Sequence, residues 1–323
     1  PNSTEMAIHI GYIRAGWQGL ILAGICFILP AVLITGGFAW VYVTFGTLPQ
    51  IYPLFYGIKP AVLAVILNAV WRLGKTALKN RKLLIIALAV SILVFLGVNE
   101  IISLLLGALL GMLWLKLSDQ KSGTKLHSWI LHYPFYLLLS STSVPVTPPL
   151  WQLGLFFLKI GSVLFGSGYV LVAFLEGGLV NERGWLTQQQ LLDAIAIGQF
   201  TPGPVLSTAT FIGYIISGLP GSIVATIAIF LPSFIFVAAL NPLIPRLRAS
   251  KWTAAFLDAV NVSSIALMAV VTLKLAAATL TDGISILIAI IAAILAIRLK
   301  VNSAWLVLGG ALIGWIAKFL LNL

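Results

Sequence analysis

The sequence contains an internal repeat. A segment that begins at Gly11-Tyr12 matches a second segment that begins at Gly213-Tyr214, at a constant offset of 202 residues. The shared positions are mostly glycine, proline and aliphatic residues: Gly11, Tyr12, Ile13, Gly16, Gly19, Ile21, Ala23, Ile25, Leu29 and Pro30 match Gly213, Tyr214, Ile215, Gly218, Gly221, Ile223, Ala225, Ile227, Leu231 and Pro232. Farther along, Arg72 falls opposite Lys274, and Gly107 falls opposite Gly310. We therefore predict two structural repeats that cover nearly the whole chain.

The apolar content of the repeats indicates the solvent in which they fold. Hydrophobic residues make up 60% of the chain and charged residues 8%, and the mean hydropathy is +1.10, which is far outside the range of soluble globular chains. The net charge of +11 comes from short Lys and Arg clusters between apolar runs, as in membrane loops, so we exclude nucleic acid as a partner. The single Cys26 and three scattered histidines show no disulfide or metal-ligand pattern, and we expect no cofactor. We predict an all-α polytopic membrane protein.

Apolar runs and linkers divide the chain into two halves. We predict a first repeat over residues 1–117, a polar and Pro-rich cytoplasmic linker over 118–150, and a second repeat over 151–323. Each half has room for about five crossings. The expected crossings are residues 17–45, 54–71, 83–97 and 101–115, then 151–180, 219–240, 252–273, 284–297 and 304–321.

Two local signals predict details within these halves. Pro30 and the pair Gly36-Gly37 should bend the first crossing. Thr187 and Gln190 have the spacing of a capping box, so the segment Thr187–Ile197 should form a short amphipathic helix.

The distribution of basic loops indicates how each half is oriented. Lys and Arg gather at 72–82 and 116–125 in the first half, but at 246–251 and 298–300 in the second, which is a displacement by one loop. Because positively charged loops face the cytoplasm, equivalent loops of the two halves should lie on opposite sides of the membrane. An odd number of crossings per half agrees with this arrangement, whereas parallel repeats with an even number are the alternative. We predict inverted repeats.

The stretch Pro202-Gly203-Pro204 interrupts the second half at membrane depth. A broken backbone is tolerated there only if protein buries it or it lines a watery cavity, so we predict a re-entrant hairpin. A kink in a packed helix is the alternative. Pro1 takes the place of Pro204 in the first repeat, so we expect a longer protein in which the first helix of that repeat, about fifty residues by symmetry, precedes Pro1.

The half-helix that follows Pro204 predicts an anion site. Its first N–H groups have no helical partner, and both these groups and the helix dipole favour negative charge. Its twin in the first repeat should approach from the opposite face and meet it near the midplane. The candidate anion-binding residues are Thr201, Gly203, Ser207 and Thr208, with Asn2, Ser3 and Thr4 from the first repeat. The candidate structural residues are Pro202 and Pro204, with Gly166 and Gly168, which either allow close helix packing or break a helix beside the hairpin.

Charged residues inside the apolar runs complete the set of candidates. Lys59 lies inside an apolar run, where an unpaired ammonium costs about 2.5–3.5 kcal/mol. Its side chain therefore either binds the anion in a cavity or extends to the lipid headgroups. We take Glu5 and Asp258 as the first candidates for proton coupling, because Glu5 lies in the hairpin and Asp258 lies on the helix equivalent to that of Lys59. Glu176 and Asp193 are the other acidic residues near membrane segments. The alternative role for an acidic residue here is an ion pair, with Arg14 or Arg183 as the partner.

The order of the motifs resembles a known family. The motifs are Phe165-Gly166-Ser167-Gly168, Gly184-Trp185, Asp193, Gln199 and Pro202-Gly203-Pro204, with Pro1-Asn2-Ser3-Thr4-Glu5-Met6-Ala7 and Gly11-Tyr12. They are similar to those of the bacterial chromate transporter family over nearly the whole chain. The resemblance implies the two-domain form of the family in the bacterial cytoplasmic membrane, with antiparallel halves. It also implies proton-driven export of chromate, recognition of sulfate, and chromate resistance. The family's N-terminal Phe-Gly-Gly-type motif has no counterpart in this sequence.

Three functions compete on the sequence. The first is secondary active transport of an inorganic oxyanion, with the oxyanion, protons and the lipid bilayer as partners and a homodimer left open. The second is a membrane-embedded enzyme that acts on a phosphorylated or lipid substrate, but the sequence has no recognisable catalytic or metal constellation for it. The third is a passive anion channel, which would need no proton coupling. We favour the transporter and expect no catalytic residues.

Overall fold

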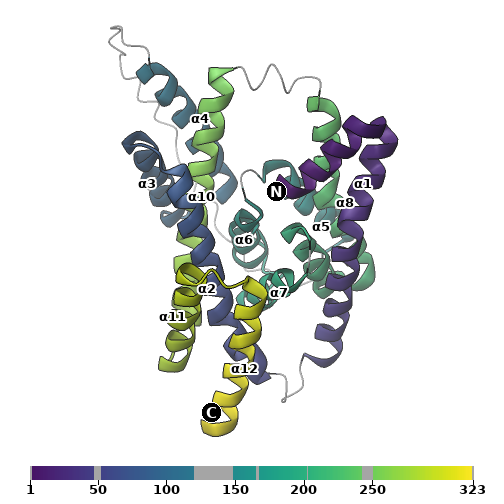
Figure 1. Cartoon of the computed structure of the whole chain (residues 1–323), viewed down its shortest axis with the longest axis vertical. Coiled ribbons are helices and arrows are strands. Elements are labelled where there is room, and N and C mark those ends of the chain that lie inside the picture. Colours follow the sequence, from purple (N-terminus) through teal and green to yellow (C-terminus); the bar gives the residue numbers. More distant parts are fainter. Residues whose placement is uncertain are drawn as a thin grey trace.

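The computed structural model describes residues 2–46, 52–119, 148–164, 167–201, 203–241 and 250–321. Within these ranges the regular structure is entirely helical, and it comprises eleven α-helices with short 3-10 and π-helical segments (Figure 1). In the first half they are α1 Asn2–Phe45, α2 Tyr52–Ala77, α3 Arg81–Phe95 and α4 Glu100–Asp119. In the second half they are α5 Leu150–Val163, η1 Gly168–Val170, α6 Leu171–Leu175, η2 Glu176–Glu182, α7 Gln188–Phe200, η3 Val205–Ser207, α8 Thr208–Leu240, α10 Lys251–Thr279, α11 Gly283–Arg298 and α12 Ser303–Leu321.

Four helical stretches are long and apolar enough to cross a membrane: Ser3–Phe45, Pro53–Ala77, Val205–Leu240 and Lys251–Thr279. Shorter apolar helices include Leu150–Val163 and Gly283–Arg298. The fold is therefore the all-helical, multi-span arrangement that the sequence predicts. The predicted linker lies largely outside the described residues, as do Gly166 and Pro202.

Helices α1 and α8 both reverse direction near their N-terminal ends, at equivalent positions. Gly16 has φ 56° and ψ −140°, and Gly218 has φ 63° and ψ −153°, a region that only glycine adopts readily. Each reversal divides its helix into a short arm before the glycine and a long arm after it. In α1 the two arms touch along their backbones, because a Cβ on Gly19 would overlap the carbonyl oxygen of Gly11. In a straight helix these two residues would lie about 12 Å apart. Non-helical backbone in α1 thus falls at Ala15 and Gly16, and the bend at Pro30 and Gly36-Gly37 stays a prediction.

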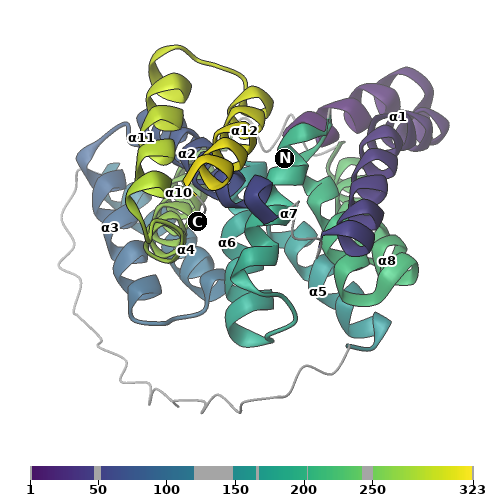
Figure 2. The same cartoon turned by 90° about the horizontal axis from the view of Figure 1, so that it is seen from below.

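Helices at equivalent positions in the two halves pack against each other in antiparallel fashion. Near the start of α2, the Tyr56 hydroxyl donates to Asp282 Oδ1, 2.6 Å away, just beyond the end of α10. Beyond the end of α2, Lys79 Nζ lies 2.9 Å from Asp258 Oδ1 near the start of α10. Helices α1 and α8 also lie side by side (Figures 1 and 2). Ser233 Oγ, late in α8, donates to Glu5 Oε1, early in α1, at 3.0 Å. Thr35 Oγ1, late in α1, donates to Ser207 Oγ, just before α8, at 3.3 Å. The two helices therefore run in opposite directions.

Each half of the chain also packs one of its helices onto the other half. Helix α2 lies against α11 and α12, and its equivalent α10 lies against α3 and α4. The contacts use small residues at matching positions. A Cβ on Gly314 of α12 would lie 2.6 Å from the Cα of Gly57 on α2, and a Cβ on Gly111 of α4 would lie 2.9 Å from the Cβ of Ala259 on α10. Small residues let these backbones approach closely, as helices in a bilayer commonly do.

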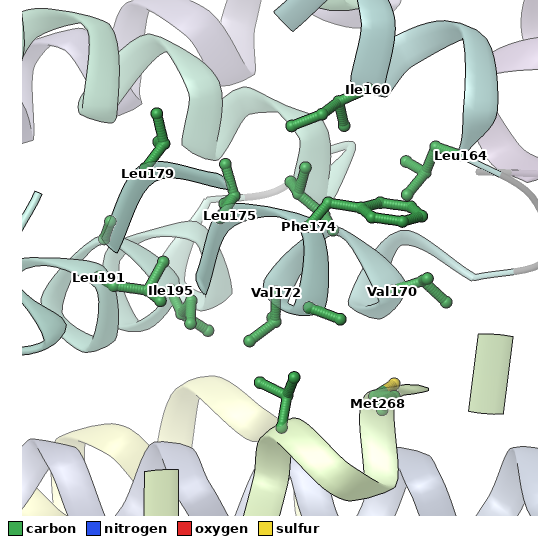
Figure 3. Packing of buried hydrophobic residues seen from close by; sticks show 14 of the residues in the cluster. Ile160, Leu164, Val170, Val172, Phe174, Leu175, Leu179, Leu191, Ile195 and Met268 are labelled. Carbon is green, nitrogen blue, oxygen red and sulfur yellow. The ribbon is translucent and has the colours of Figure 1, made fainter. Parts of the chain in front are cut away.

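The helices form two groups with α6 and α7 between them. Figure 2 shows α2, α3, α4, α10, α11 and α12 on one side and α1, α5 and α8 on the other. Buried side chains from both groups and from the middle layer share one hydrophobic core. Figure 3 shows part of this core, where Ile160 of α5, Phe174 of α6, Ile195 of α7 and Met268 of α10 gather. The middle layer is thus held from both sides.

Helix α7 begins as predicted and is buried more deeply than predicted. The capping box is confirmed: Thr187 accepts from the Gln190 backbone N–H, and the Gln190 side chain accepts from that of Thr187. The helix itself is not amphipathic, because Leu191 through Ala196 are all buried. Contacts with α2, α8 and α12 explain this burial. The prediction of an amphipathic helix missed these contacts because they come from distant parts of the chain.

Candidate functional site

The chain breaks between α7 and α8 at the stretch that the sequence singled out. Helix α7 ends at Phe200, and a short 3-10 turn, Val205–Ser207, leads into α8. Gly203 has φ 154°, and a Cβ there would lie 2.6 Å from the Cβ of Ala31 on α1. A glycine is required at this position because the broken backbone passes so close to α1.

Four buried hydroxyl groups surround this break. Thr35 Oγ1 donates to Ser207 Oγ at 3.3 Å, and Thr201 Oγ1 donates to the Gly198 carbonyl oxygen at 3.1 Å. Thr201 Oγ1 and Ser207 Oγ lie 3.5 Å apart. Thr208 is only 1% exposed, and its hydroxyl has no hydrogen-bond partner among the described residues. A buried hydroxyl without a partner costs about 1–3 kcal/mol, so it calls for a ligand or a water.

A second helix break lies beside the first. Helix α5 ends at Val163, and η1 begins at Gly168 with Ser167 as its N-cap. A Cβ on Gly168 would lie 3.2 Å from the Cβ of Val205, so the two breaks are in contact. Gly168 therefore belongs to a broken helix beside the predicted hairpin, one of the two alternatives that the sequence left open.

Gln199 connects the two breaks. Its Oε1 accepts a 3.1 Å hydrogen bond from the hydroxyl of Tyr169 on η1. Its Nε2 is buried and has no partner in the described part of the chain. With the Thr208 hydroxyl, this amide adds a second buried donor with no partner, and an arrangement of neutral donors is suited to an anion.

The buried carboxylate of Asp193 on α7 contacts the later part of α1. Asp193 is 1% exposed, and its Oδ2 accepts a 2.9 Å hydrogen bond from the Tyr42 hydroxyl. Lys59, half-buried on α2, attracts the Asp193 carboxylate electrostatically. The Tyr42 ring lies 5.2 Å from that of Phe211, and Tyr42 is about 10 Å along α1 from Thr35. Lys59 therefore lies within electrostatic range of a carboxylate inside the protein.

No hydrogen bond joins Ser3 or Thr4, predicted from the first repeat, to this hydroxyl cluster in the described structure. Thr4 is buried with an unpartnered hydroxyl in the described structure, Ser3 is exposed, and the Asn2 side chain lies outside the described set. Glu5 bonds Ser233 on the long arm of α8. This part of α8 lies beside Gly24 of α1, since a Cβ on Gly24 would overlap the ring of Phe234.

The first turns of α1 run back along the rest of the helix, because a Cβ on Gly24 would lie 3.2 Å from Cγ1 of Ile8, and Gly203 lies beside Ala31 of the same helix. The contacts of the described residues do not bring the two half-helix starts together.

Asp258 occupies a more exposed setting. Its carboxylate pairs with Lys79, and the two side chains are 40% and 59% exposed. The pair lines a cavity of about 460 Å³ that also contains Ser167, Asn261 and Ser264. Asp258 therefore lies at the rim of the molecule, on the same helix as its predicted position but with a cation already paired to it.

Sequence reasoning missed Thr35, Tyr42 and Gln199 as site residues. Gln199 appeared only as a motif position, and Asp193 only as one acidic residue among several. The signal for Asp193 was its place on the segment directly before the Pro-Gly-Pro break. Thr35 and Tyr42 have no local signal, since only the antiparallel packing of α1 against α8 and α7 gives them their partners.

Comparisons with known proteins agree with this architecture. The chromate transporter family profile matches residues 1–112 and 151–315. The chromate transport protein of Cupriavidus metallidurans is 34% identical over 100% of this chain and 81% of its own length. The probable chromate transport protein of Synechococcus elongatus is 32% identical over 91% of this chain and 75% of its own length. The chromate transport protein of Pseudomonas aeruginosa is 30% identical over 98% of this chain and 79% of its own length. No solved structure matches. The chain is thus a multi-pass membrane protein of the chromate transporter family.

Proposed function

We propose that the protein is a secondary active transporter that exports chromate across the bacterial cytoplasmic membrane in exchange for protons. The observation that carries the proposal is the break between α7 and α8, where buried donors without partners meet the start of a half-helix. The family supports chromate as the transported ion. Sulfate is a tetrahedral dianion of the same charge, so we propose that it competes for the same site.

The course of the helices supports inverted repeats. Equivalent helices of parallel repeats run in the same direction, whereas α2 and α10 run in opposite directions, as Tyr56–Asp282 and Lys79–Asp258 show at their two ends. Inverted repeats with broken helices at membrane depth are the common architecture of transporters that expose one site alternately to each side. The proposed re-entrant hairpin consists of α7, the break at Pro202-Gly203-Pro204 and the first turns of α8.

The anion would be bound by neutral donors and one cation. The Ser207 and Thr208 hydroxyls lie at the start of the α8 half-helix, whose N-terminus favours negative charge. Thr35, Thr201 and the Gln199 amide add donors from α1 and α7. Lys59 supplies positive charge from α2. We propose Thr201, Gly203, Ser207, Thr208 and Lys59 as substrate-binding residues of the second repeat's break, and Asn2, Ser3 and Thr4 as an equivalent set in the first repeat.

Proton coupling needs an acidic side chain that changes its protonation state during transport. Glu5 and Asp258 are the candidates that the repeat symmetry favours. Glu5 is hydrogen-bonded to Ser233 and Asp258 is paired with Lys79. A further acidic side chain in the described structure is the buried Asp193.

Transport by the full-length protein in proteoliposomes tests the function. An imposed pH gradient should drive chromate movement, unlabelled sulfate should reduce it, and collapse of the gradient with a protonophore should stop it. Chromate flux that is insensitive to the pH gradient would instead indicate the passive channel. No chromate flux in either direction would refute the proposal.

A further inference from the structure

We propose that Asp193 is the side chain that takes up and releases the coupled proton, and that Lys59 and Tyr42 hold its ionised form. This inference rests on the proposed function and assigns its coupling step to a residue. The assignment follows from three properties of Asp193: its burial, its incomplete set of partners and its place on the helix that leads into the break.

The first property is burial within the interior of a membrane protein. Asp193 is 1% exposed and lies on α7, which contacts α1, α2, α8 and α12. Ionisable residues inside membrane proteins are costly and commonly mark ion pathways and proton relays. Glu5 and Asp258 lack this property, because Glu5 is partly buried and Asp258 is at the exposed rim.

The second property is that the partners of Asp193 satisfy it only in part. Tyr42 donates to Oδ2 at 2.9 Å, and the Lys59 ammonium attracts the carboxylate from α2. Oδ1 is buried and has no hydrogen-bond partner among the described residues. Lys59 and Tyr42 are the charged and titratable groups that act on Asp193 from the described elements around it. One carboxylate oxygen thus remains available for a proton in an otherwise enclosed place.

The third property is proximity to the candidate anion site. Tyr42 lies on the same helix as Thr35, two turns from the hydroxyl cluster, and Tyr42 packs on Phe211 at the start of α8. Lys59 belongs both to the partners of Asp193 and to the candidate anion-binding residues. Asp193 and a bound oxyanion would both be negatively charged partners of Lys59, so the protonation of Asp193 and the binding of the anion are linked.

Glu176 is the other fully buried acidic residue that the structure describes, and it does not share this place. Glu176 begins the π-helical segment η2, and the charged group that acts on it from α4 is another carboxylate, Glu100. Glu176 thus lies near a second carboxylate, whereas Asp193 lies near a cation and a hydroxyl donor. The proton step itself is simple: the Asp193 carboxylate accepts one proton from water on one side and becomes a carboxylic acid, then returns that proton to water on the other side.

The test compares two modes of transport in proteoliposomes that contain the full-length protein. Net chromate movement driven by a pH gradient requires proton uptake and release. Exchange of labelled for unlabelled chromate, with equal pH on both sides, requires only that the loaded site changes sides. A trapped pH-sensitive dye reports proton movement when chromate is added.

The variant Asp193→Asn should lose gradient-driven net transport and chromate-induced proton movement, and it should keep chromate exchange. Glu182→Gln changes an exposed carboxylate outside the site and is the control, which should keep all three activities. Retained proton movement in Asp193→Asn would overturn the proposal. Loss of proton movement in Glu5→Gln or Asp258→Asn with exchange intact would assign the coupling to that residue instead.

Asp193→Glu covers the case in which Asp193→Asn fails to fold. This variant keeps a titratable carboxyl and should shift the pH profile of net transport while exchange continues. An unchanged pH profile, or the loss of exchange in both variants, would show that the role of Asp193 is structural. Wild-type exchange serves as the separate test of the proposed function, because its absence would refute chromate transport whatever the variants do.

Discussion

Tyr56 donates a 2.6 Å hydrogen bond to Asp282 Oδ1, and this contact joins the start of α2 to the end of α10. Asp282 is also the N-cap of α11, where it accepts from the backbone N–H groups of Ile284 and Ser285. One carboxylate therefore holds three helices from the two halves of the chain. It is a point where a single change should loosen the contact between those halves.

Asp282→Ala should lower the free energy of unfolding by about 0.5–2 kcal/mol at neutral pH, the usual range for a lost N-cap. Burial raises the pKa of Asp282, but hydrogen bonds from Tyr56, Ser285 and Ile284 outweigh it and place the pKa below its ordinary value. A lowered folded-state pKa contributes stability above the unfolded pKa, and this contribution is lost as the pH falls through the folded value. Thermal unfolding in detergent across pH should show this.

The difference between wild type and Asp282→Ala should be constant near neutral pH and should shrink below about pH 4, where the unfolded carboxyl protonates. Tyr56→Phe, which keeps the cap and removes one hydrogen bond, should give a smaller loss. A difference that grows as the pH falls would contradict the assignment.

Gly57→Ala should destabilise the contact between α2 and α12. A Cβ at this position would overlap the carbonyl oxygen of Gly310, and overpacking of this kind costs about 1–3 kcal/mol. The control is Gly74→Ala on the same helix, where a Cβ meets nothing within 4 Å and the gain in helix propensity is about 1 kcal/mol. Melting in detergent should move down for Gly57→Ala and not for Gly74→Ala. Equal melting temperatures would contradict the packing described here.

Gly16→Ala and Gly218→Ala should each destabilise the protein although neither Cβ would clash with a neighbour. The cost is conformational, about 1–3 kcal/mol, because both residues have φ near +60° with strongly negative ψ. Gly37→Ala, in helical backbone with open space around it, is the control and should be neutral or stabilising. If Gly16→Ala melts as Gly37→Ala does, the reversal of α1 is not required for stability.

Thr208→Val should weaken chromate transport without loss of stability. The Thr208 hydroxyl has no protein partner in the described structure, so its removal breaks no internal hydrogen bond. A hydrogen bond to a charged ligand contributes about 1.5–3 kcal/mol, which corresponds to roughly a 10- to 100-fold higher KM for chromate. Thr272→Val, which removes a buried hydroxyl bonded to the Met268 carbonyl of its own helix, should leave the KM unchanged. An unchanged KM in Thr208→Val would remove Thr208 from the site.

The sequence predicted the class of fold and the location of the break, because hydropathy and glycine and proline act locally. Long apolar runs became long helices, Thr187 and Gln190 formed the predicted cap, and Gly16 and Gly218 repeat one backbone conformation. These features need little knowledge of the rest of the chain.

Side-chain partners across the two halves could not be predicted in the same way. Thr35 meets Ser207, and Tyr42 meets Asp193, only because α1 lies antiparallel to α8 and beside α7. The pairing of Asp258 with Lys79 depends on the antiparallel α2 and α10 in the same manner. An internal repeat shows which helices are equivalent, but it does not show which ones touch.

The close glycine contacts between α2 and α12, and their counterparts between α10 and α4, constrain how this protein changes shape. A swing of one repeat against the other would pull these backbones apart, since each repeat has a helix embedded in its neighbour. The packed units are therefore of mixed origin: the bundle around α2 and α10 is one, and α1, α5 and α8 form the other. The border between these units passes along α6 and α7, where both helix breaks and Asp193 lie.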